Sequence, residues 1–528
     1  MTLTHDAEAD QVRPAEETAA ASPRSRLAAL AGAASGGLGL GVGALLAHLL
    51  APGGSPVPSV SELILRLLPP ALINFGKEAL GAADKPVLNL LVLLGALALA
   101  TLAGHLGAHR RRVGYLLLSG LSVLALAAVL LAPDGLLRNA FPVVVGWVVA
   151  VLALRALLRR LPMDQGDPIF PSDLPTDRRR FLALAGLTGG GAVLAGAGTL
   201  VLPEAGASSS AASAIQLPQA AVPAAPIPAG ADFRLPGLAP YVTPNDAFYR
   251  IDTAFVVPRL QVEDWTLRIV GKVEREIELS MADVLARPLE EHDVTLTCVS
   301  NVVGGSLIGN ARWLGLRLST LLAEARPLPG ADMVLSRSAD DFTAGTPLEF
   351  MTDPNRPSLL AVGMNGEPLP VKHGFPARLV VPGLYGYVSA TKWVVELKLT
   401  SFADDQGYWT PLGWSAKGPI KLSSRIDTPI DAVDAGTVVL AGVAWSQHVG
   451  ISRVQVRIDD ADWADADLAD VSGPDTWRQW RLEWSATPGE HTVAVRAVDA
   501  DGLVQDERVR DVLPDGATGL DTRTISVR

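Results

Sequence analysis

Apolar runs long enough to cross a lipid bilayer fill much of the N-terminal third of this chain. A membrane-spanning helix needs about 20 apolar residues. Of the 528 residues, 49% are hydrophobic and only 19% are charged, which is too apolar for a wholly soluble protein. We therefore predict a transmembrane region at residues 27–160, after a cytoplasmic tail at residues 1–26. Its four expected spans are Leu27–Leu50, Val87–Leu106, Val113–Leu131 and Phe141–Leu158.

The stretch Val60–Leu80, between the first and second runs, has a different composition. It contains charged residues such as Glu62, Arg66 and Lys77 together with the Pro69-Pro70 pair. A lipid-exposed helix tolerates such residues poorly. We interpret this stretch as an interfacial or re-entrant segment that does not cross the membrane.

Arginine clusters predict the orientation of the spans, because cytoplasmic loops collect Lys and Arg. Arg24 and Arg26 precede the first span, Arg110–Arg112 follow the second, and Arg159-Arg160 follow the fourth. With four spans and a cytoplasmic N-terminus, all these clusters lie on the cytoplasmic side. A full span at Val60–Leu80 would place the triple arginine outside.

A further basic signal lies at residues 177–202. Arg178-Arg179-Arg180-Phe181-Leu182 leads into a small-residue apolar run, and this resembles a twin-arginine export signal. The alternative is an ordinary fifth span with a basic cytoplasmic flank. Both interpretations place the rest of the chain on the extracytoplasmic side of the cytoplasmic membrane. Residues 203–232, rich in Ala, Ser and Pro, are predicted to be a flexible linker.

The remaining residues predict two β-containing domains. Residues 233–424 alternate short strands with Gly/Pro turns and two helical stretches, Met281–Ala286 and Leu318–Ala325, which is typical of an α+β domain. Residues 425–528 show strands at about ten-residue spacing, which favours an immunoglobulin-like β-sandwich. The expected strands are Thr437–Trp445, Val454–Ile458, Trp477–Trp484 and His491–Val498.

Cys298 is the only cysteine in the chain. It cannot form an intramolecular disulfide or complete a multi-cysteine metal site. The residue types leave three possibilities: a buried small hydrophobe, a nucleophile or a single metal–thiolate bond.

Several separated motifs in the extracytoplasmic part resemble one family. They are Thr243–Asn245, Phe248–Arg250, Cys298–Asn301, Gly309–Gly315, Met364–Gly366 and His373–Arg378, followed by Pro382-Gly383, Gly386, Ser389 and Lys392-Trp393. In this order they resemble the sulfite oxidase-like family of molybdopterin enzymes, with its catalytic domain and its immunoglobulin-like dimerisation domain. The resemblance implies a Mo-molybdopterin cofactor and an oxidoreductase.

The resemblance also implies the site residues. Cys298 would be the metal ligand and Arg250 a catalytic residue near the substrate. A lone soft thiolate suits a metal also held by dithiolene sulfurs, and cationic side chains suit a pterin phosphate. The expected cofactor-binding residues are Asn245, Phe248, Tyr249, Arg250, Cys298, Asp340, His373, Arg378, Ser389, Ala390, Thr391 and Lys392.

The chain departs from the family's sulfite-oxidising members at three places. Ile251-Asp252 replaces Asn-His, Val302-Val303 replaces basic residues, and Gly413-Trp414 lies near the position of a catalytic tyrosine. Losing these polar groups weakens the hold on a small dianion. We therefore expect sulfite to be a poor substrate.

The expected function is two-electron oxygen-atom transfer on a small substrate by a membrane-anchored enzyme, either S- or N-oxide reduction or sulfur-compound oxidation. We identify no haem domain, so a separate quinone-linked or cytochrome electron carrier is implied, and a homodimer is implied by the resemblance. The net charge of −11 argues against nucleic acid as a partner. The alternatives are a non-catalytic surface protein that uses the same fold for adhesion or sensing, and a transporter, for which the spans offer few polar groups.

Overall fold

The computed structural model describes residues 23–69, 83–132, 137–161, 175–201, 215–254 and 256–528, together with residues 72–73, 75–76 and 80. The chain divides into two compact units. One contains most of residues 1–203, and the other contains residues 61–85, 130–136 and 204–528. Residues 1–22 of the predicted tail and residues 203–214 of the predicted linker lie outside the described part.

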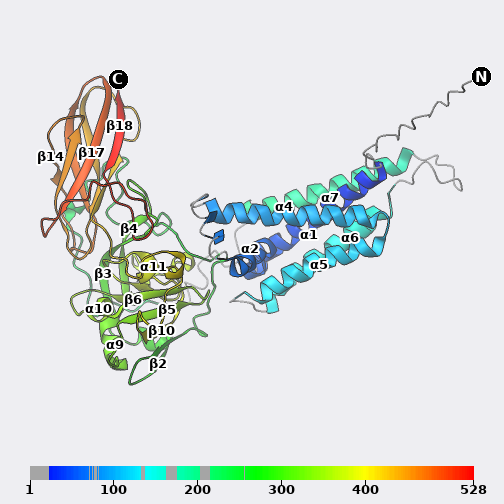
Figure 1. Cartoon of the computed structure of the whole chain (residues 1–528), viewed down its shortest axis with the longest axis horizontal. Helices are drawn as coiled ribbons and strands as arrows, with labels where there is room; N and C mark the ends of the chain where they lie inside the picture. Colours follow the sequence, from blue (N-terminus) through cyan, green and yellow to red (C-terminus); the bar gives the residue numbers. More distant parts are fainter. Residues whose placement is uncertain are drawn as a thin grey trace, which may run out of the picture. The chain divides into compact units, whose positions relative to one another are not determined.

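Among the described residues of the N-terminal unit, five helices are long and apolar, and Figure 1 shows how they run. By length and composition, each could cross a membrane. All four predicted spans are helical, and a fifth apolar helix occupies the segment with the arginine-rich start. The helices are α1 (Pro23–Leu50), α4 (Asp84–Gly107), α5 (Arg111–Leu130), α6 (Leu137–Leu158) and α7 (Pro175–Val201).

The segment predicted to be interfacial contains the short helix α2 (Pro56–Leu67). Its 12 residues are about 18 Å long at about 1.5 Å per residue, well short of the roughly 30 Å hydrocarbon core. This helix is therefore too short to span a bilayer. Its placement at a membrane interface stays a prediction.

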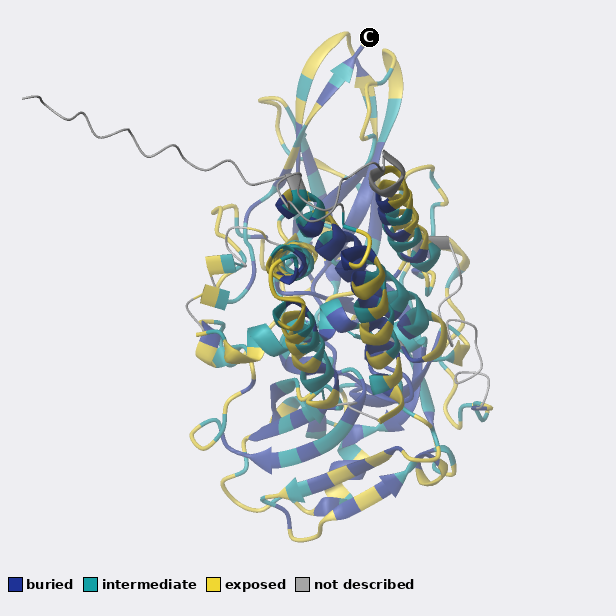
Figure 2. Ribbon diagram, turned by 90° about the vertical axis from the view of Figure 1, so that its right-hand side faces the viewer, coloured by how far each residue is buried: buried dark blue, intermediate teal, exposed yellow. Residues whose placement is uncertain are grey.

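Glycines let α1 pack tightly against three neighbours. A Cβ atom added to Gly32 would collide with the Ala100 carbonyl of α4, one on Gly39 would lie 2.6 Å from the Gly146 carbonyl of α6, and one on Gly41 would lie 2.8 Å from the Ala192 carbonyl of α7. Small residues at helix contacts are the usual way in which apolar helices associate in lipid. Exposed apolar positions recur along the long helices (Figure 2).

Two sheets form the predicted α+β domain, and one large hydrophobic core contacts both of them. The first has the order β2-β1-β10-β5-β6 with β1 and β10 parallel, and the second joins β3, β4, β7 and β8, with β9 paired to β7. The first sheet comprises β1 (Thr266–Gly271), β2 (Ile277–Ser280), β5 (Met333–Ser338), β6 (Thr343–Pro347) and β10 (Val394–Thr400). The second comprises β3 (Glu290–Thr297), β4 (Ile308–Arg317), β7 (Leu359–Met364), β8 (Glu367–Pro368) and β9 (Arg378–Val380).

Four short helices connect these strands. The two that the sequence predicted are α8 (Met281–Leu285) and α9 (Leu318–Ala325), within one residue of the expected ends. Ser280 and Asp283 form a reciprocal capping box at the start of α8, which satisfies backbone donors there. The other two are α10 (Leu348–Thr352) and α11 (Gly386–Ser389).

Part of the predicted linker packs on this domain. Ile215 is buried in its core, Ala221 donates a backbone hydrogen bond to Leu289, and Ala231 is fully buried. The described part of the predicted linker is thus in contact with the folded part at Ile215, Ala221 and Ala231, whereas Val222 and Ile227 between them are exposed.

Two four-stranded sheets share one core in the C-terminal domain, as expected of a β-sandwich. The predicted strands correspond to β12, β13, β16 and β17, whereas the other four strands were not predicted. One sheet comprises β11 (Ser423–Thr428), β12 (Gly436–Trp445), β15 (Asp467–Leu468) and β16 (Arg478–Ala486). The other comprises β13 (Ile451–Ile458), β14 (Ala464–Asp465), β17 (Gly489–Asp499) and β18 (Asp521–Val527).

Candidate active site

Cys298 lies directly after β3, at the start of the loop that leads to β4. The residue is buried, and its backbone N–H donates to the Leu307 carbonyl at 3.0 Å. The Asn301 side chain accepts from the Leu307 N–H at 2.8 Å, and the Asn301 N–H donates to the Cys298 carbonyl. These bonds close the loop and hold the thiol at a fixed position. Among the described residues, no cluster of three or more His, Cys, Asp or Glu side chains forms a candidate metal site.

Tyr249 lies close to this thiol and also to Arg378. Burial, and then the negative charge at Cys298, raise the pKa of Tyr249 above its ordinary value. The phenol therefore stays protonated and can serve as a hydrogen-bond donor. A Cβ atom added to Gly386 would lie 4.0 Å from the Tyr249 hydroxyl and 3.8 Å from the carbonyl of Thr297. The start of α11 thus approaches the backbone just before the thiol.

Arg378 is a buried cation that is held by neutral groups. Its guanidinium donates to the carbonyl of His373 at 3.1 Å and stacks on Trp313, 5.0 Å from the ring centroid. Burial lowers the pKa of Arg378 to about 10, so the group is still charged at neutral pH. In the part of the chain that the structure describes, Arg378 forms no ion pair. A buried charge without a counter-charge is costly, so this site favours an anion.

His373 connects two of the predicted motifs. It is almost fully buried, and its Nε2 lies 3.0 Å from the backbone carbonyl of Asn245. Burial, followed by the nearby charge of Arg378, lowers the pKa of His373 to about 3. The imidazole is therefore neutral at physiological pH, and its Nε2–H donates to Asn245. The ring also packs edge-on against Phe248 at 5.7 Å between centroids.

Arg250, Asp252 and Lys392 form a compact ion-pair group. The Asp252 carboxylate accepts from Arg250 Nε at 2.8 Å and from Lys392 Nζ at 2.6 Å. Burial opposes ionisation of Asp252, but Lys392 and Arg250 outweigh it and hold the pKa of this carboxyl well below its usual range. Burial lowers the pKa of Lys392 to about 8 against the opposing effect of Asp252. Two of the expected cationic residues are therefore already paired with a carboxylate.

The other predicted cofactor-binding residues form hydrogen bonds within the protein. The Ser389 hydroxyl donates to the Leu384 and Tyr385 carbonyls, and the Thr391 hydroxyl lies 2.7 Å from that of Ser336. The Ala390 carbonyl lies 3.4 Å from a nitrogen of Arg378. One oxygen of Asp340 accepts from Thr253, and the other accepts from the Phe342 N–H. These residues shape the site mainly through the backbone.

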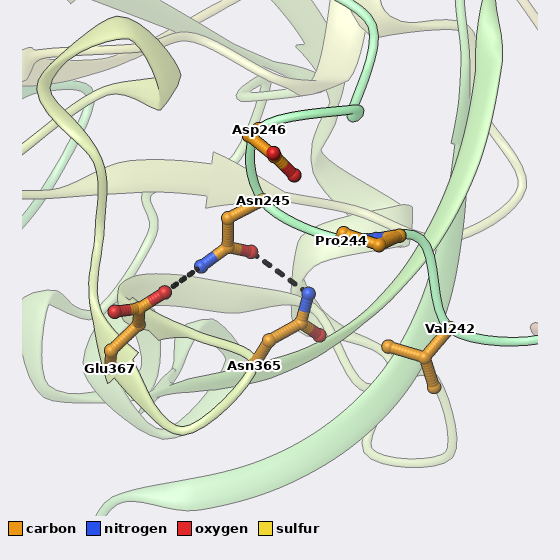
Figure 3. Close-up of a pocket in the computed structure, with 6 residues that line it drawn as sticks. All are labelled: Val242, Pro244, Asn245, Asp246, Asn365 and Glu367. Carbon is orange, nitrogen blue, oxygen red and sulfur yellow. Dashed lines mark hydrogen bonds between the residues drawn. The ribbon is translucent and has the colours of Figure 1, made fainter.

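Asn245 lines a separate pocket (Figure 3). Its amide nitrogen donates to Glu367 at 2.7 Å, and its oxygen accepts from Asn365 at 2.8 Å. The pocket is also lined by Val242, Pro244 and Asp246, and does not include Cys298, Arg378 or Lys392. Two carboxylates in its lining oppose binding of a phosphate-bearing cofactor. The buried Arg378 and the Cys298 thiol fit such a cofactor better.

The sequence pointed to most of these residues but missed two relationships. Asp252 was noted as a departure from the family, yet its pairing with Arg250 and Lys392 was not predicted. A carboxylate placed between two expected cations was the available signal. The contact of Trp313 with Arg378 was also missed, although Trp313 lies within one of the motifs.

Comparison with known proteins identifies the domain that contains this thiol. Residues 254–409 match the family model of the oxidoreductase molybdopterin binding domain. Residues 254–409 are therefore a molybdopterin-binding oxidoreductase domain that is similar to that of the sulfite oxidases. The predictions of a molybdenum-dependent oxidoreductase and of a Mo-molybdopterin cofactor are confirmed at the level of this domain.

The chain is similar to several named proteins. Mitochondrial sulfite oxidase of Rattus norvegicus is 30% identical over 326 residues, covering 52% of this chain and 58% of that protein. NADPH nitrate reductase of Fusarium oxysporum is 32% identical over 175 residues, covering 29% of this chain and 19% of that protein. The solved sulfane dehydrogenase SoxCD from Paracoccus pantotrophus is 26% identical, covers 55% of this chain and 84% of that chain, and has a TM-score of 0.48. The chain thus spans little more than half the length of its mammalian relatives.

Proposed function

We propose that this protein is a membrane-anchored molybdopterin-dependent oxidoreductase that transfers an oxygen atom to or from a small substrate. The observation that carries the proposal is the buried Cys298 thiol beside Tyr249 and the unpaired cation of Arg378. In the reducing direction, an S-oxide takes up two electrons and two protons and releases a thioether and water. Oxidation of a sulfur compound is the reverse, and N-oxide reduction has the same balance.

Each site residue has a proposed role. Cys298 would bind molybdenum, and Arg378, His373 and Lys392 would hold the pterin and its phosphate. The bound group would supply the two-electron redox chemistry. Arg250 would lie on the substrate side, and Tyr249 would donate a hydrogen bond near the thiol. The remaining predicted cofactor residues, Asn245, Phe248, Asp340, Ser389, Ala390 and Thr391, would fix the loops around it.

The proposed location is the cytoplasmic membrane, with residues 203–528 on the extracytoplasmic side. The support is the arginine pattern at the helix ends: Arg24 and Arg26, Arg110–Arg112, Arg159-Arg160 and Arg179-Arg180 share one side when the five helices alternate. The segment at 177–202 would act as a twin-arginine-like signal or as a plain fifth span. Electrons would come from, or pass to, a separate quinone-linked or cytochrome carrier.

The domain division that we propose keeps residues 233–424 as the molybdopterin-binding domain and residues 425–528 as an immunoglobulin-like dimerisation domain. The support for the second is its two four-stranded sheets around one core. The dimer rests on family resemblance alone.

Metal and pterin content tests this function directly. We would purify the full chain in detergent from a host that makes molybdopterin, beside a Cys298→Ser variant. Stoichiometric molybdenum and pterin in the parent, with an altered molybdenum EPR signal in the variant, would support the proposal. A well-folded parent without either would contradict it and would favour a non-catalytic surface protein for adhesion or sensing.

A further inference from the structure

Five aromatic side chains form a continuous group next to the site, here called the aromatic cluster. Neighbouring ring centroids are 5.9 Å apart for Phe342 and Tyr408, 4.9 Å for Tyr408 and Trp409, 6.3 Å for Trp409 and Trp414, and 5.9 Å for Trp414 and Tyr387. These spacings are within the usual range for interacting rings. The cluster joins three segments that are far apart in the sequence.

Short chain connections join both ends of the aromatic cluster to the surroundings of the proposed site. Tyr387 belongs to α11 and follows Gly386, the residue that approaches the Tyr249 hydroxyl and the Thr297 carbonyl. Phe342 donates its backbone N–H to Asp340, whose other carboxylate oxygen accepts from Thr253. Thr253 directly follows Asp252 of the ion-pair group. The aromatic cluster is therefore carried by segments that adjoin both the surroundings of the thiol and the ion-pair group.

The rings of the aromatic cluster are only partly covered. Tyr408 is 38% exposed, and the other four are half-buried. Four of the five rings, all except Tyr387, lie outside the hydrophobic core of the domain. The cluster thus presents an apolar aromatic surface that a ligand can contact.

The ion-pair group argues against a small dianion as the ligand. Asp252 occupies the donors of Arg250, the cation proposed for the substrate side, which would otherwise bind anionic oxygens. Lys392 and Lys85 also lie at this carboxylate, 2.6 and 3.6 Å away, and hold it in place. An incoming sulfite would meet this carboxylate and would have to displace it from Arg250. An uncharged substrate meets no such penalty.

We propose that the substrate is an uncharged organic S-oxide, or the corresponding thioether, whose apolar group stacks on the aromatic cluster. This inference rests on the proposed oxygen-atom transfer and specifies its substrate class. The aromatic cluster provides the apolar contact, and Asp252 excludes sulfite by occupying Arg250.

Steady-state kinetics of the molybdenum-loaded full chain test this selectivity. Methyl phenyl sulfoxide and dimethyl sulfoxide would be compared with reduced viologen as the electron donor, and the matching sulfides with ferricyanide as the acceptor. In the working direction we expect a KM about tenfold lower for the phenyl compound, equivalent to about 1.4 kcal/mol. Equal KM values in an active enzyme would overturn the inference and leave the proposed function intact. No turnover of any of these compounds would count against both.

Substitutions in the aromatic cluster test whether the substrate contacts these rings. Trp414→Leu should remove the preference for the phenyl compound by raising its KM. Tyr408→Leu replaces a more exposed ring and should also lower the preference for the phenyl compound. It provides a second test of the contact if Trp414→Leu misfolds. Trp463→Leu is the matched control, because Trp463 is a half-buried tryptophan of the β-sandwich that contacts Arg457 and Arg496. If Trp414→Leu and Tyr408→Leu both kept the preference for the phenyl compound, the inference would be wrong.

Binding without turnover gives a second readout. Methyl phenyl sulfone, which is not reduced by the viologen, should change the tryptophan fluorescence of the oxidised parent but not that of Trp414→Leu. Asp252→Asn should strengthen inhibition by sulfite about tenfold, because the neutral amide holds Arg250 less firmly and leaves its donors available to the anion. Sulfite inhibition that is the same in the parent and in Asp252→Asn would refute the exclusion by Asp252.

Discussion

At the residue scale, the site combines one buried cation that lacks a counter-charge with two cations that share a carboxylate. Arg378 is the buried cation without a counter-charge among the described residues, and Arg250 and Lys392 share the carboxylate of Asp252. Uncompensated buried charge is expensive in a folded protein and persists where a ligand or a reaction needs it. We therefore expect the pterin phosphate to depend mainly on Arg378, and less on Arg250 and Lys392, which the sequence also predicted as cofactor-binding cations.

Replacing Arg378 by methionine should separate cofactor binding from stability. We expect Arg378→Met to lose most of its pterin, measured as pterin fluorescence after denaturation and oxidation. Apo-protein made without molybdopterin should instead become more stable by about 1–2 kcal/mol, because an unpaired buried charge is removed. A thermal unfolding scan of the apo-variant in detergent measures this, and Arg326→Met, at an exposed arginine, is the control. Full pterin retention would contradict the assignment of Arg378.

His373 should make the protein sensitive to acid. The pKa of His373 is lowered to about 3, so the folded state stays unprotonated while the unfolded chain binds a proton below about pH 6.5. Stability is therefore lost as the pH falls from about 6.5 towards 3, by about 1 kcal/mol between pH 6 and 5. Denaturant unfolding at several pH values should show this slope in the parent and a shallower one in His373→Gln. A slope of equal size in the variant would exclude His373 as the source.

At the element scale, the sequence predicts what depends on local pattern. The long helices were predictable because about 20 apolar residues have few alternatives to a span, and the α8 and α9 helices and four sandwich strands because their residue periodicity is clear. The pairing of Asp252 with Lys392, 140 positions away, was not predictable because only the tertiary fold brings them together. The same holds for the rings of Phe342, Tyr387 and Trp414.

Crowding the α1 contact with α6 should destabilise the helical unit. Gly39→Leu would force a side chain into the space beside the Gly146 carbonyl, which a Cβ atom alone would approach to 2.6 Å. Overpacking of this kind costs about 1–3 kcal/mol. We expect a lower thermal midpoint in detergent. Gly95→Leu is the matched control, since no atom lies within 4 Å of the Cβ that it adds, and equal behaviour of the two variants would argue against this contact.

At the scale of the whole molecule, the arrangement of apolar helices and folded domains determines which side of the membrane each part occupies. In the part of the chain that the structure describes, five helices could span a membrane, and five spans would place the segments before α1 and after α7 on opposite sides. Short α2 matters here, because a sixth span would return residues 215–528 to the cytoplasm. The side of the membrane is therefore a sensitive test of how many helices cross it.

Single added cysteines should report this topology, because the chain's own Cys298 is buried and should react slowly. His109→Cys lies at an exposed position between α4 and α5, and Asp501→Cys lies at an exposed turn after β17. On intact cells, a membrane-impermeant maleimide should label Asp501→Cys and leave His109→Cys unlabelled until the cells are opened. The unaltered chain measures the background from Cys298. Labelling of His109→Cys alone on intact cells would reverse the proposed orientation and would place the oxidoreductase domain in the cytoplasm.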